Sequence, residues 1–177
     1  MSLLNEIPPD DAEGRLAALY TVFQQTLGFI PKAFQMASVS PELLEQHWRY
    51  LSYYLRHPEL SPALTACIRL LVSKRAACRY CVDLNRALLV QNGATPEVIE
   101  AMTTDPSQAP LSAKERALLQ FTLRATADPH AIEAADIQAL RALGYSDQVI
   151  FDALHHGARQ IAFDILIDAF KVEPEGF

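Results

Sequence analysis

The sequence is poor in the residues that favour strands and in the segments that cross membranes. Only six of its 177 residues are glycine, and it has few runs of β-branched residues. A chain rich in alanine and leucine with this composition favours helices over strands. No apolar run approaches the ~20 residues that a helix needs to span a bilayer. We therefore expect an all-α protein with no membrane partner.

Other features that the sequence lacks limit the expected cellular compartment and the expected binding partners. The first residues lack a basic region followed by a long apolar one, so we expect no leader peptide. An odd count of three cysteines, two of them in a C-x-x-C pair, fits a reducing compartment better than a secreted disulfide framework. The formal net charge of −6 argues against nucleic acid as the main partner. These features predict a cytoplasmic protein.

The chain has enough apolar residues for one domain, and it contains an internal repeat. Half of the residues are hydrophobic, which excludes disorder and predicts a single helical domain over residues 1–177. Leu-Ser at 60–61 recurs at 111–112, and the block at 93–99 resembles the block at 144–150, both at the same offset. We expect duplicated helical hairpins, repeat 1 over about 60–102 and repeat 2 over about 111–153.

All three cysteines lie in the first repeat, where Cys78 and Cys81 form the C-x-x-C pair. The surrounding sequence is typical of a helix, on which residues three apart have Cβ atoms about 5–6 Å apart. A disulfide needs about 3.5–4.5 Å, so a small adjustment closes the bond. The pair is therefore a candidate redox switch. Cys67, on the preceding helix, is expected to be buried among apolar residues.

Basic residues surround the pair, namely Lys74, Arg75, Arg79 and Arg86. Cations and a helix N-terminus both favour the thiolate, which is the nucleophile. The sequence suggests a break near residues 73–77, with a new helix that starts just before Cys78. We therefore expect a lowered thiol pKa.

The cysteines have three other interpretations: an inert pair, a zinc site and a haem attachment motif. The pair is inert if both residues are small core side chains. A zinc site needs two further ligands, usually a second close-spaced pair, and none exists, so no metal is expected. Val82 after the second cysteine excludes the C-x-x-C-H haem pattern. No glycine-rich phosphate-binding motif is present, so no cofactor is expected either.

From Leu60 onward the chain resembles the AhpD-like, or carboxymuconolactone decarboxylase-like, family, in its peroxidase-related alkylhydroperoxidase branch. The resemblance rests on L-S-P, the segment I-R-L-L-V-S, and C-x-Y-C-V-D-L followed by N-G-A-T. It extends upstream to L-G-F-I-P-K-A-F and downstream to the C-terminal V-E-P-E. The resemblance implies the AhpD-like helical fold and a thiol-dependent peroxidase.

The chain departs from this family at two positions. The family motif has a histidine four residues after the second cysteine and a glutamate twelve before the first, whereas this sequence has Asn85 and Ala66. Neither residue takes up a proton near neutral pH, although Asn85 can orient a peroxide by hydrogen bonding. His155 or His156, on the last helix, is a candidate replacement base. Tyr80, inside the C-x-x-C motif, is a further auxiliary candidate.

The resemblance implies a peroxiredoxin-type oxidoreductase with an antioxidant role. Cys81 would attack a hydroperoxide and become sulfenic acid. Cys78 would then form the disulfide and meet the reductant, which is a dithiol or a protein. Two alternatives stay open: a thiol-disulfide protein without peroxidase activity, and a non-catalytic helical oligomer that binds a ligand or partner.

The segment Pro41 to Arg56 predicts a helix that is apolar on more than one face. One face can pack on the core, and the second needs another partner, either inside the domain or on another subunit. Together with the family habit, this predicts a homo-oligomer, a trimer or a hexamer built from trimers. The last helix, from Ser146 to about Phe170, is so apolar that we expect it to be mostly buried. The tail after it is expected to extend along the surface.

Overall fold

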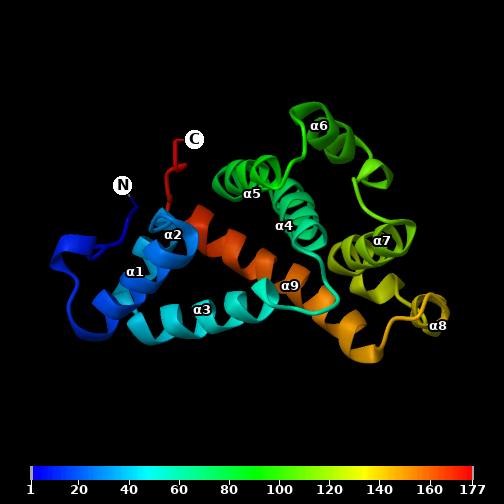
Figure 1. Cartoon of the computed structure of the whole chain (residues 1–177), viewed down its shortest axis with the longest axis horizontal. Helices are drawn as coiled ribbons and strands as arrows, with labels where there is room; N and C mark the ends of the chain where they lie inside the picture. The colour runs from blue at the N-terminus through cyan, green and yellow to red at the C-terminus, as the bar shows by residue number, and fades with distance from the viewer. Residues whose placement is uncertain (1, 177) are drawn as a thin grey trace.

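The computed structural model describes residues 2–176, and within this range every regular element is helical, which confirms the all-α prediction. Figure 1 shows their arrangement. The α-helices are α1 (Gly14–Leu27), α2 (Lys32–Met36), α3 (Pro41–Leu55), α4 (Pro62–Ala76), α5 (Arg79–Gln91), α6 (Pro96–Thr104), α7 (Ala113–Ala127), α8 (Ala134–Ala142) and α9 (Asp147–Ala169). Short 3-10 turns are η1 (Pro9–Asp11), η2 (Ala37–Val39), η3 (Pro106–Gln108) and η4 (Pro129–Ala131).

Local sequence signals fix several of the helix starts. The side chains of Ser61, Thr95, Ser112 and Ser146 each accept a hydrogen bond from the backbone N–H three residues later, at the starts of α4, α6, α7 and α9. Such N-caps satisfy donors that the first turn leaves unpaired. These bonds explain why each of these four helices begins directly after a serine or threonine.

Helix α9 runs through the middle of the molecule and packs against both α4 and α7 (Figure 1). Gly157 permits this approach, because a Cβ atom there would lie 2.9 Å from Thr122 Cγ2 and 3.5 Å from Ile68 Cγ2. The expectation that α9 is mostly buried was wrong for part of its surface, since Ile165 and Leu166 are 61% and 45% exposed. Helices α3, α4 and α7 therefore cover only part of the surface of α9.

Two separate apolar clusters make up the interior. The larger one joins α4, α6, α7 and the first half of α9, and it contains Cys67. The smaller one is formed by α1, α2, the start of α3 and the end of α9, and it contains Cys78 and Cys81. The cysteine pair therefore belongs to a different part of the core from the third cysteine.

The two sequence blocks have matched first helices. Helices α4 and α7 both span 15 residues, and their bounds differ by the offset of the sequence repeat. After α4 the chain forms the long helix α5, whereas after α7 it forms η4 and the shorter α8. The duplication remains a prediction, and the second halves of the two blocks differ in structure.

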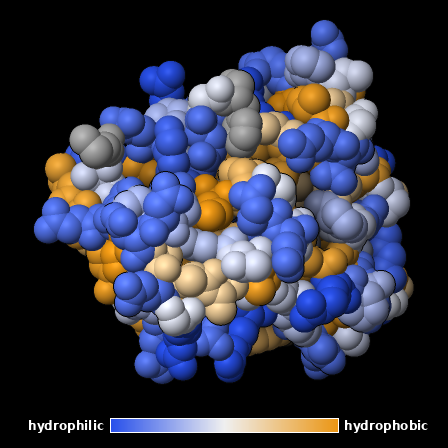
Figure 2. All heavy atoms as spheres, turned by 60° about the vertical axis from the view of Figure 1, so that its left-hand side comes forward, coloured by the Kyte–Doolittle hydropathy of each residue, from blue (hydrophilic) through white to orange (hydrophobic). Residues whose placement is uncertain are grey.

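The apolar faces of α3 are covered only in part by the rest of the chain. The hydroxyls of Tyr50 and Tyr54 contact His156 and His155 of α9, so most of the second face packs inside the chain. Leu43 and Leu55 remain more than half exposed. Hydrophobic residues form small patches among hydrophilic ones on the face that Figure 2 presents. The oligomer thus stays a prediction with a smaller apolar surface to support it.

The expectation for the tail was wrong in part, because the tail folds back. Val172 is buried, and the Glu175 carboxylate accepts hydrogen bonds from the Tyr80 hydroxyl and, at 2.7 Å, from the backbone N–H of Lys32. These bonds are possible because the C-terminal segment after α9 lies beside α2 (Figure 1). No helix in residues 2–176 is long and apolar enough to cross a membrane.

Candidate functional site

A break between α4 and α5 positions the cysteine pair, as the sequence predicted. Ala77 adopts a left-handed conformation with φ 60°, and Cys78 is the N-cap residue of α5. The N–H of Cys78 donates to the carbonyl of Ser73 at 3.0 Å. Cys81, Asn85 and Leu89 follow at helical spacing on the buried face of α5. The break therefore directs both thiols into the smaller core cluster.

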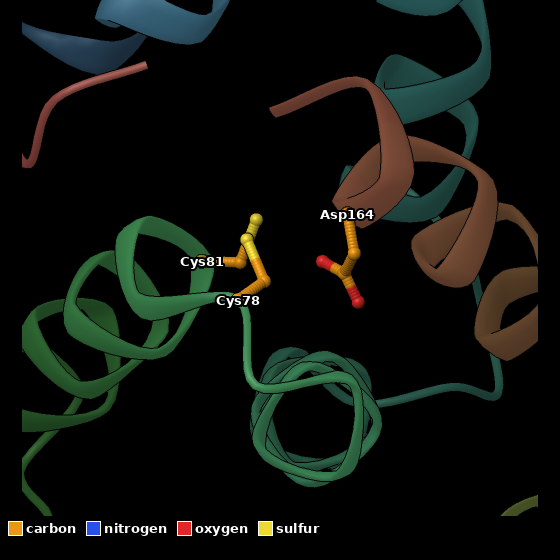
Figure 3. Close-up of side chains that lie close together, drawn as sticks. All are labelled: Cys78, Cys81 and Asp164. Carbon is orange, nitrogen blue, oxygen red and sulfur yellow. The ribbon is translucent and has the colours of Figure 1, made fainter. Parts of the chain in front are cut away.

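Opposite the thiols lies Asp164 of α9, a residue that the sequence interpretation missed. One side-chain donor atom from each of Cys78, Cys81 and Asp164 lies within 4.8 Å of the other two. Figure 3 shows the two sulfurs and the carboxylate facing each other between the start of α5 and α9. All three residues are almost fully buried, with exposed fractions of 0%, 2% and 1%.

The two oxygens of Asp164 have different surroundings. Oδ1 accepts hydrogen bonds from Ser73 Oγ at 2.8 Å and from Gln160 Nε2 at 2.7 Å. Oδ2 is buried and has no hydrogen-bond partner of good geometry among the described residues. One oxygen thus holds the side chain in place, and the other is available to a proton or a ligand.

Burial and mutual charge raise the proton affinity of this group. The pKa of Cys81 is raised by its contact with Cys78, by burial and by the Asp164 carboxylate. The pKa of Asp164 is raised chiefly by burial, while the neighbouring Gln160, Cys81 and Ser73 side chains act in the opposite direction. The Cys81 thiol therefore holds its proton in the resting site, and the carboxylate is the group poised to accept it.

The predicted lowering of the thiol pKa was wrong for Cys81. The basic side chains near it in sequence are held elsewhere: Lys74 by the Thr103 carbonyl, Arg75 by the Leu123 and Thr126 carbonyls, Arg79 by the Asp83 carboxylate and Arg86 by that of Glu100. The Arg79 side chain is 86% exposed. These cations are close to the cysteines in sequence, but their side chains lie on the surface, away from the sulfurs.

Cys81 also lines a cavity of about 220 Å³ between α2, α3, α4, α5 and α9. Its walls are mainly apolar and aromatic, including Phe34, Trp48 and Phe163. Ala66 and Asn85, the positions where the resembling family has its glutamate and histidine, both line it. Cys78 does not line it. A small molecule in the cavity therefore meets Cys81 first.

A chain of hydrogen bonds crosses this cavity wall. Asn85 Nδ2 donates to the carbonyl of Cys81 at 2.8 Å, and Asn85 Oδ1 accepts from Arg69 Nε at 2.7 Å. Arg69 Nη1 lies 3.1 Å from His156 Nε2, and the Tyr50 hydroxyl lies 2.6 Å from His156 Nδ1. Sequence reasoning missed Arg69, which lies one helical turn after Ala66.

The other auxiliary candidates have structural partners. His156 is fully buried, and burial and Arg69 keep its pKa well below the usual value. His155 Nδ1 lies 3.0 Å from the Tyr54 hydroxyl, and His155 does not line the cavity beside Cys81. Tyr80 is buried, and its hydroxyl accepts from the N–H of Ala33 at 3.2 Å. The group nearest to both sulfurs is Asp164 rather than either histidine.

Three donors are also a partial metal site, with the two sulfurs and one carboxylate oxygen close together. A closed structural zinc site has four ligands, and no fourth side chain of a metal-binding type joins this group among the described residues. Oδ1 of Asp164 already accepts hydrogen bonds from Ser73 and Gln160. The arrangement suits proton and thiol chemistry better than metal storage.

Comparisons with known proteins identify the fold. No family model and no curated protein matches the chain. Among solved structures, an uncharacterised peroxidase-related protein from Silicibacter sp. TM1040 matches with a TM-score of 0.84 and 23% identity, over 99% of this chain and 92% of its own. An AhpD-core peroxidase-related protein from Ralstonia eutropha JMP134 matches with a TM-score of 0.86 and 21% identity, over 99% and 93%.

A third similar structure is that of the debrominase Bmp8, solved as a cysteine-to-alanine variant with 2,3,4-tribromopyrrole. It matches with a TM-score of 0.79 and 17% identity, over 99% of this chain and 93% of its own. At these identities the likeness concerns the fold. The chain has the AhpD-like helical fold over nearly its whole length, as the sequence motifs implied.

Proposed function

We propose that the protein is a thiol-dependent hydroperoxide reductase that uses Cys81 and Cys78. The observation that carries this proposal is the pair of buried sulfurs facing a buried carboxylate, with Cys81 at the wall of an apolar cavity. The fold, shared with peroxidase-related proteins, supports the same chemistry.

In the first step, the Cys81 sulfur attacks the outer oxygen of the hydroperoxide and the O–O bond breaks. Asp164 Oδ2 takes the thiol proton and returns it to the departing alkoxide, so that the products are Cys81 sulfenic acid and an alcohol. This role gives Asp164 the proton transfer that Asn85 and Ala66 cannot perform. The unpartnered Oδ2 atom facing the sulfurs supports it.

In the second step, the Cys78 sulfur attacks the Cys81 sulfenic acid, the S–S bond forms, and hydroxide leaves with the Cys78 proton as water. An external dithiol then reduces the disulfide by exchange. We expected Cys78 to meet this reductant. Its complete burial argues against that assignment, and we propose instead that a small dithiol reaches Cys81 through the cavity.

Mass spectrometry after one equivalent of an organic hydroperoxide tests the proposal. The expected product has lost two hydrogen atoms and contains a Cys78–Cys81 disulfide. Cys81→Ser should abolish peroxide consumption. In Cys78→Ser the reaction should stop at a Cys81 sulfenic acid, which dimedone traps. The control variant Cys67→Ser should consume peroxide as the parent does. Unchanged thiols, or oxidation of Cys67 alone, would contradict the proposal. A disulfide formed by disulfide reagents but not by peroxides would favour the non-peroxidatic alternative.

The aromatic cavity favours a second candidate function, thiol-dependent reductive dehalogenation. The debrominase Bmp8 shares the fold, and Phe34, Trp48 and Phe163 offer ring surfaces beside Cys81. In that reaction two thiols become a disulfide while an aryl carbon–bromine bond becomes carbon–hydrogen, with release of bromide and a proton. Bromide release from 2,3,4-tribromopyrrole in the presence of a dithiol distinguishes this activity from peroxide reduction.

A further inference from the structure

The cavity beside Cys81 has an unbalanced charge. Two arginines, Arg69 and Arg159, line it, and none of its lining residues is an aspartate, a glutamate or a lysine. Burial and the nearby Arg159 lower the pKa of His47, another lining residue, to about 4. That imidazole is therefore neutral near pH 7, and the two guanidinium groups leave the cavity cationic.

Arg69 is held in place by neutral partners. Its Nε donates to Asn85 Oδ1, and its Nη1 lies beside His156 Nε2, a ring that is neutral near pH 7. Within residues 2–176, neither Arg69 nor Arg159 forms an ion pair with a carboxylate. Arg69 is half-buried, and burial lowers its pKa.

A desolvated guanidinium without an anion is unfavourable, because buried cations are normally paired. Two hydrogen bonds fix the plane of the Arg69 group, while its Nη2 has no hydrogen-bond partner in the described chain. A guanidinium fixed in this way can bind an incoming carboxylate with little loss of side-chain entropy. The protein therefore offers a prepared cation without its own counter-ion.

The remaining walls define the rest of the ligand. Apolar cavities of about 150 Å³ admit a benzene ring, and this cavity of about 220 Å³ has room for one substituted ring or a short branched chain. Phe34 and Phe163 provide ring contacts. Asn85 connects the two ends of the site, because it bonds both Arg69 and the carbonyl of Cys81.

We infer that the cavity selects small apolar molecules that carry one carboxylate, with the anion on Arg69 and the reacting group at Cys81. Resting on the proposed function, this inference names the substrate class as a carboxylate-bearing aryl or alkyl hydroperoxide. Arg159, which lies over the Tyr50 ring with its guanidinium carbon 4.9 Å from the ring centroid, adds positive charge at the exposed side. Neutral hydroperoxides of the same shape bind more weakly.

Calorimetry with two probes of equal shape tests the anion selectivity without any turnover. For the reduced protein, 4-isopropylbenzoate should bind about tenfold or more tightly than 4-isopropylbenzamide. Arg69→Gln should remove this preference. Arg79→Gln, which makes the same charge change at an exposed position outside the cavity, should retain it. Equal affinities for the two probes in the parent, or an unchanged preference in Arg69→Gln, overturn the inference.

A measurement on the parent protein covers the case in which Arg69→Gln does not fold. In NMR spectra, the Arg69 Nε–H resonance should shift on addition of the benzoate and should not shift with the benzamide. A resonance that does not shift with the benzoate overturns the inference.

Peroxide turnover then separates the two proposals. If cumene hydroperoxide and its para-carboxy derivative are both inert while the benzoate binds selectively, peroxide reduction fails and the anion site stands. If both are consumed at equal kcat/KM, substrate selectivity fails and peroxide reduction stands.

Discussion

The ends of α4 and α7 are matched points of the two sequence blocks, and they differ in chemistry. At the end of α4, Ala77 turns the chain in a left-handed conformation and Cys78 starts α5 in the buried core. At the end of α7, Asp128 accepts a hydrogen bond from the N–H of His130 and starts the exposed turn η4. The same kind of helix thus ends in a reactive site in one block and in a local cap in the other.

The difference shows that the position of the following helix, and not the end of the first helix, makes the site. Helix α5 places its first turn against Asp164, whereas η4 leads away from the core. Cys67 gives a second contrast. Burial raises its pKa to about 12, and its sulfur lies 3.7 Å from Met102 Sδ. A buried cysteine without a carboxylate or a cavity is expected to be inert.

The largest expected effect comes from Asp164→Asn, which removes the buried carboxylate that faces the two sulfurs at the first junction. Peroxide-driven disulfide formation should slow by about 10²–10⁴-fold, the usual contribution of a placed general acid–base. Alkylation of Cys81 by iodoacetamide should become faster at a given pH, because the carboxylate raises the pKa of this thiol. Stopped-flow kinetics and the pH profile of alkylation measure the two effects.

Stability measurements provide the control for this variant. The folded-state pKa of Asp164 is raised above the ordinary value of 3.8. Its contribution to stability is therefore present below the unfolded-state pKa and is lost as the pH rises through the folded-state pKa. Asp164→Asn should be more stable than the parent at neutral pH, and the difference should shrink in acid. Asp168→Asn, at an exposed site on the same helix, should leave both reaction rates near the parent; unchanged rates in Asp164→Asn would remove the proton-transfer role.

A smaller effect is expected where the two blocks meet α9. Gly157→Ala should destabilise the fold by about 1–3 kcal/mol, since overpacking a filled interior has this range. The added Cβ would lie 2.9 Å from Thr122 Cγ2 of α7. In urea titrations, Thr122→Ser should recover part of the loss by removing that methyl group. A more stable Gly157→Ala variant would show that α7 and α9 separate there without strain.

The helices and the break before Cys78 were predictable, because caps, prolines and apolar periodicity are local signals. Asp164 was not, because the sequence does not reveal which side chain of α9 faces α5 after both helices pack. The available signal was a charged residue inside the apolar run I-A-F-D-I-L-I-D-A-F, which contains both Asp164 and the exposed Asp168. Arg69 was missed for a related reason: a single cation on an apolar helix shows no partner until the cavity is known.

The smallest expected effect has opposite signs at the two junctions. Ala77→Gly should stabilise the fold by about 0.5–1 kcal/mol, because a left-handed conformation costs a residue with a Cβ roughly 1–2 kcal/mol, while the added freedom of the unfolded chain offsets about 0.5–1 kcal/mol of the gain. Asp128→Gly should destabilise it by about 0.5–1 kcal/mol, since the turn loses its cap and the unfolded chain gains freedom. Urea titrations with unchanged m-values measure both effects. Destabilisation by glycine at both junctions would mean that Ala77 has packing contacts worth more than its backbone strain, and that the break before Cys78 is imposed by α5 rather than by the end of α4.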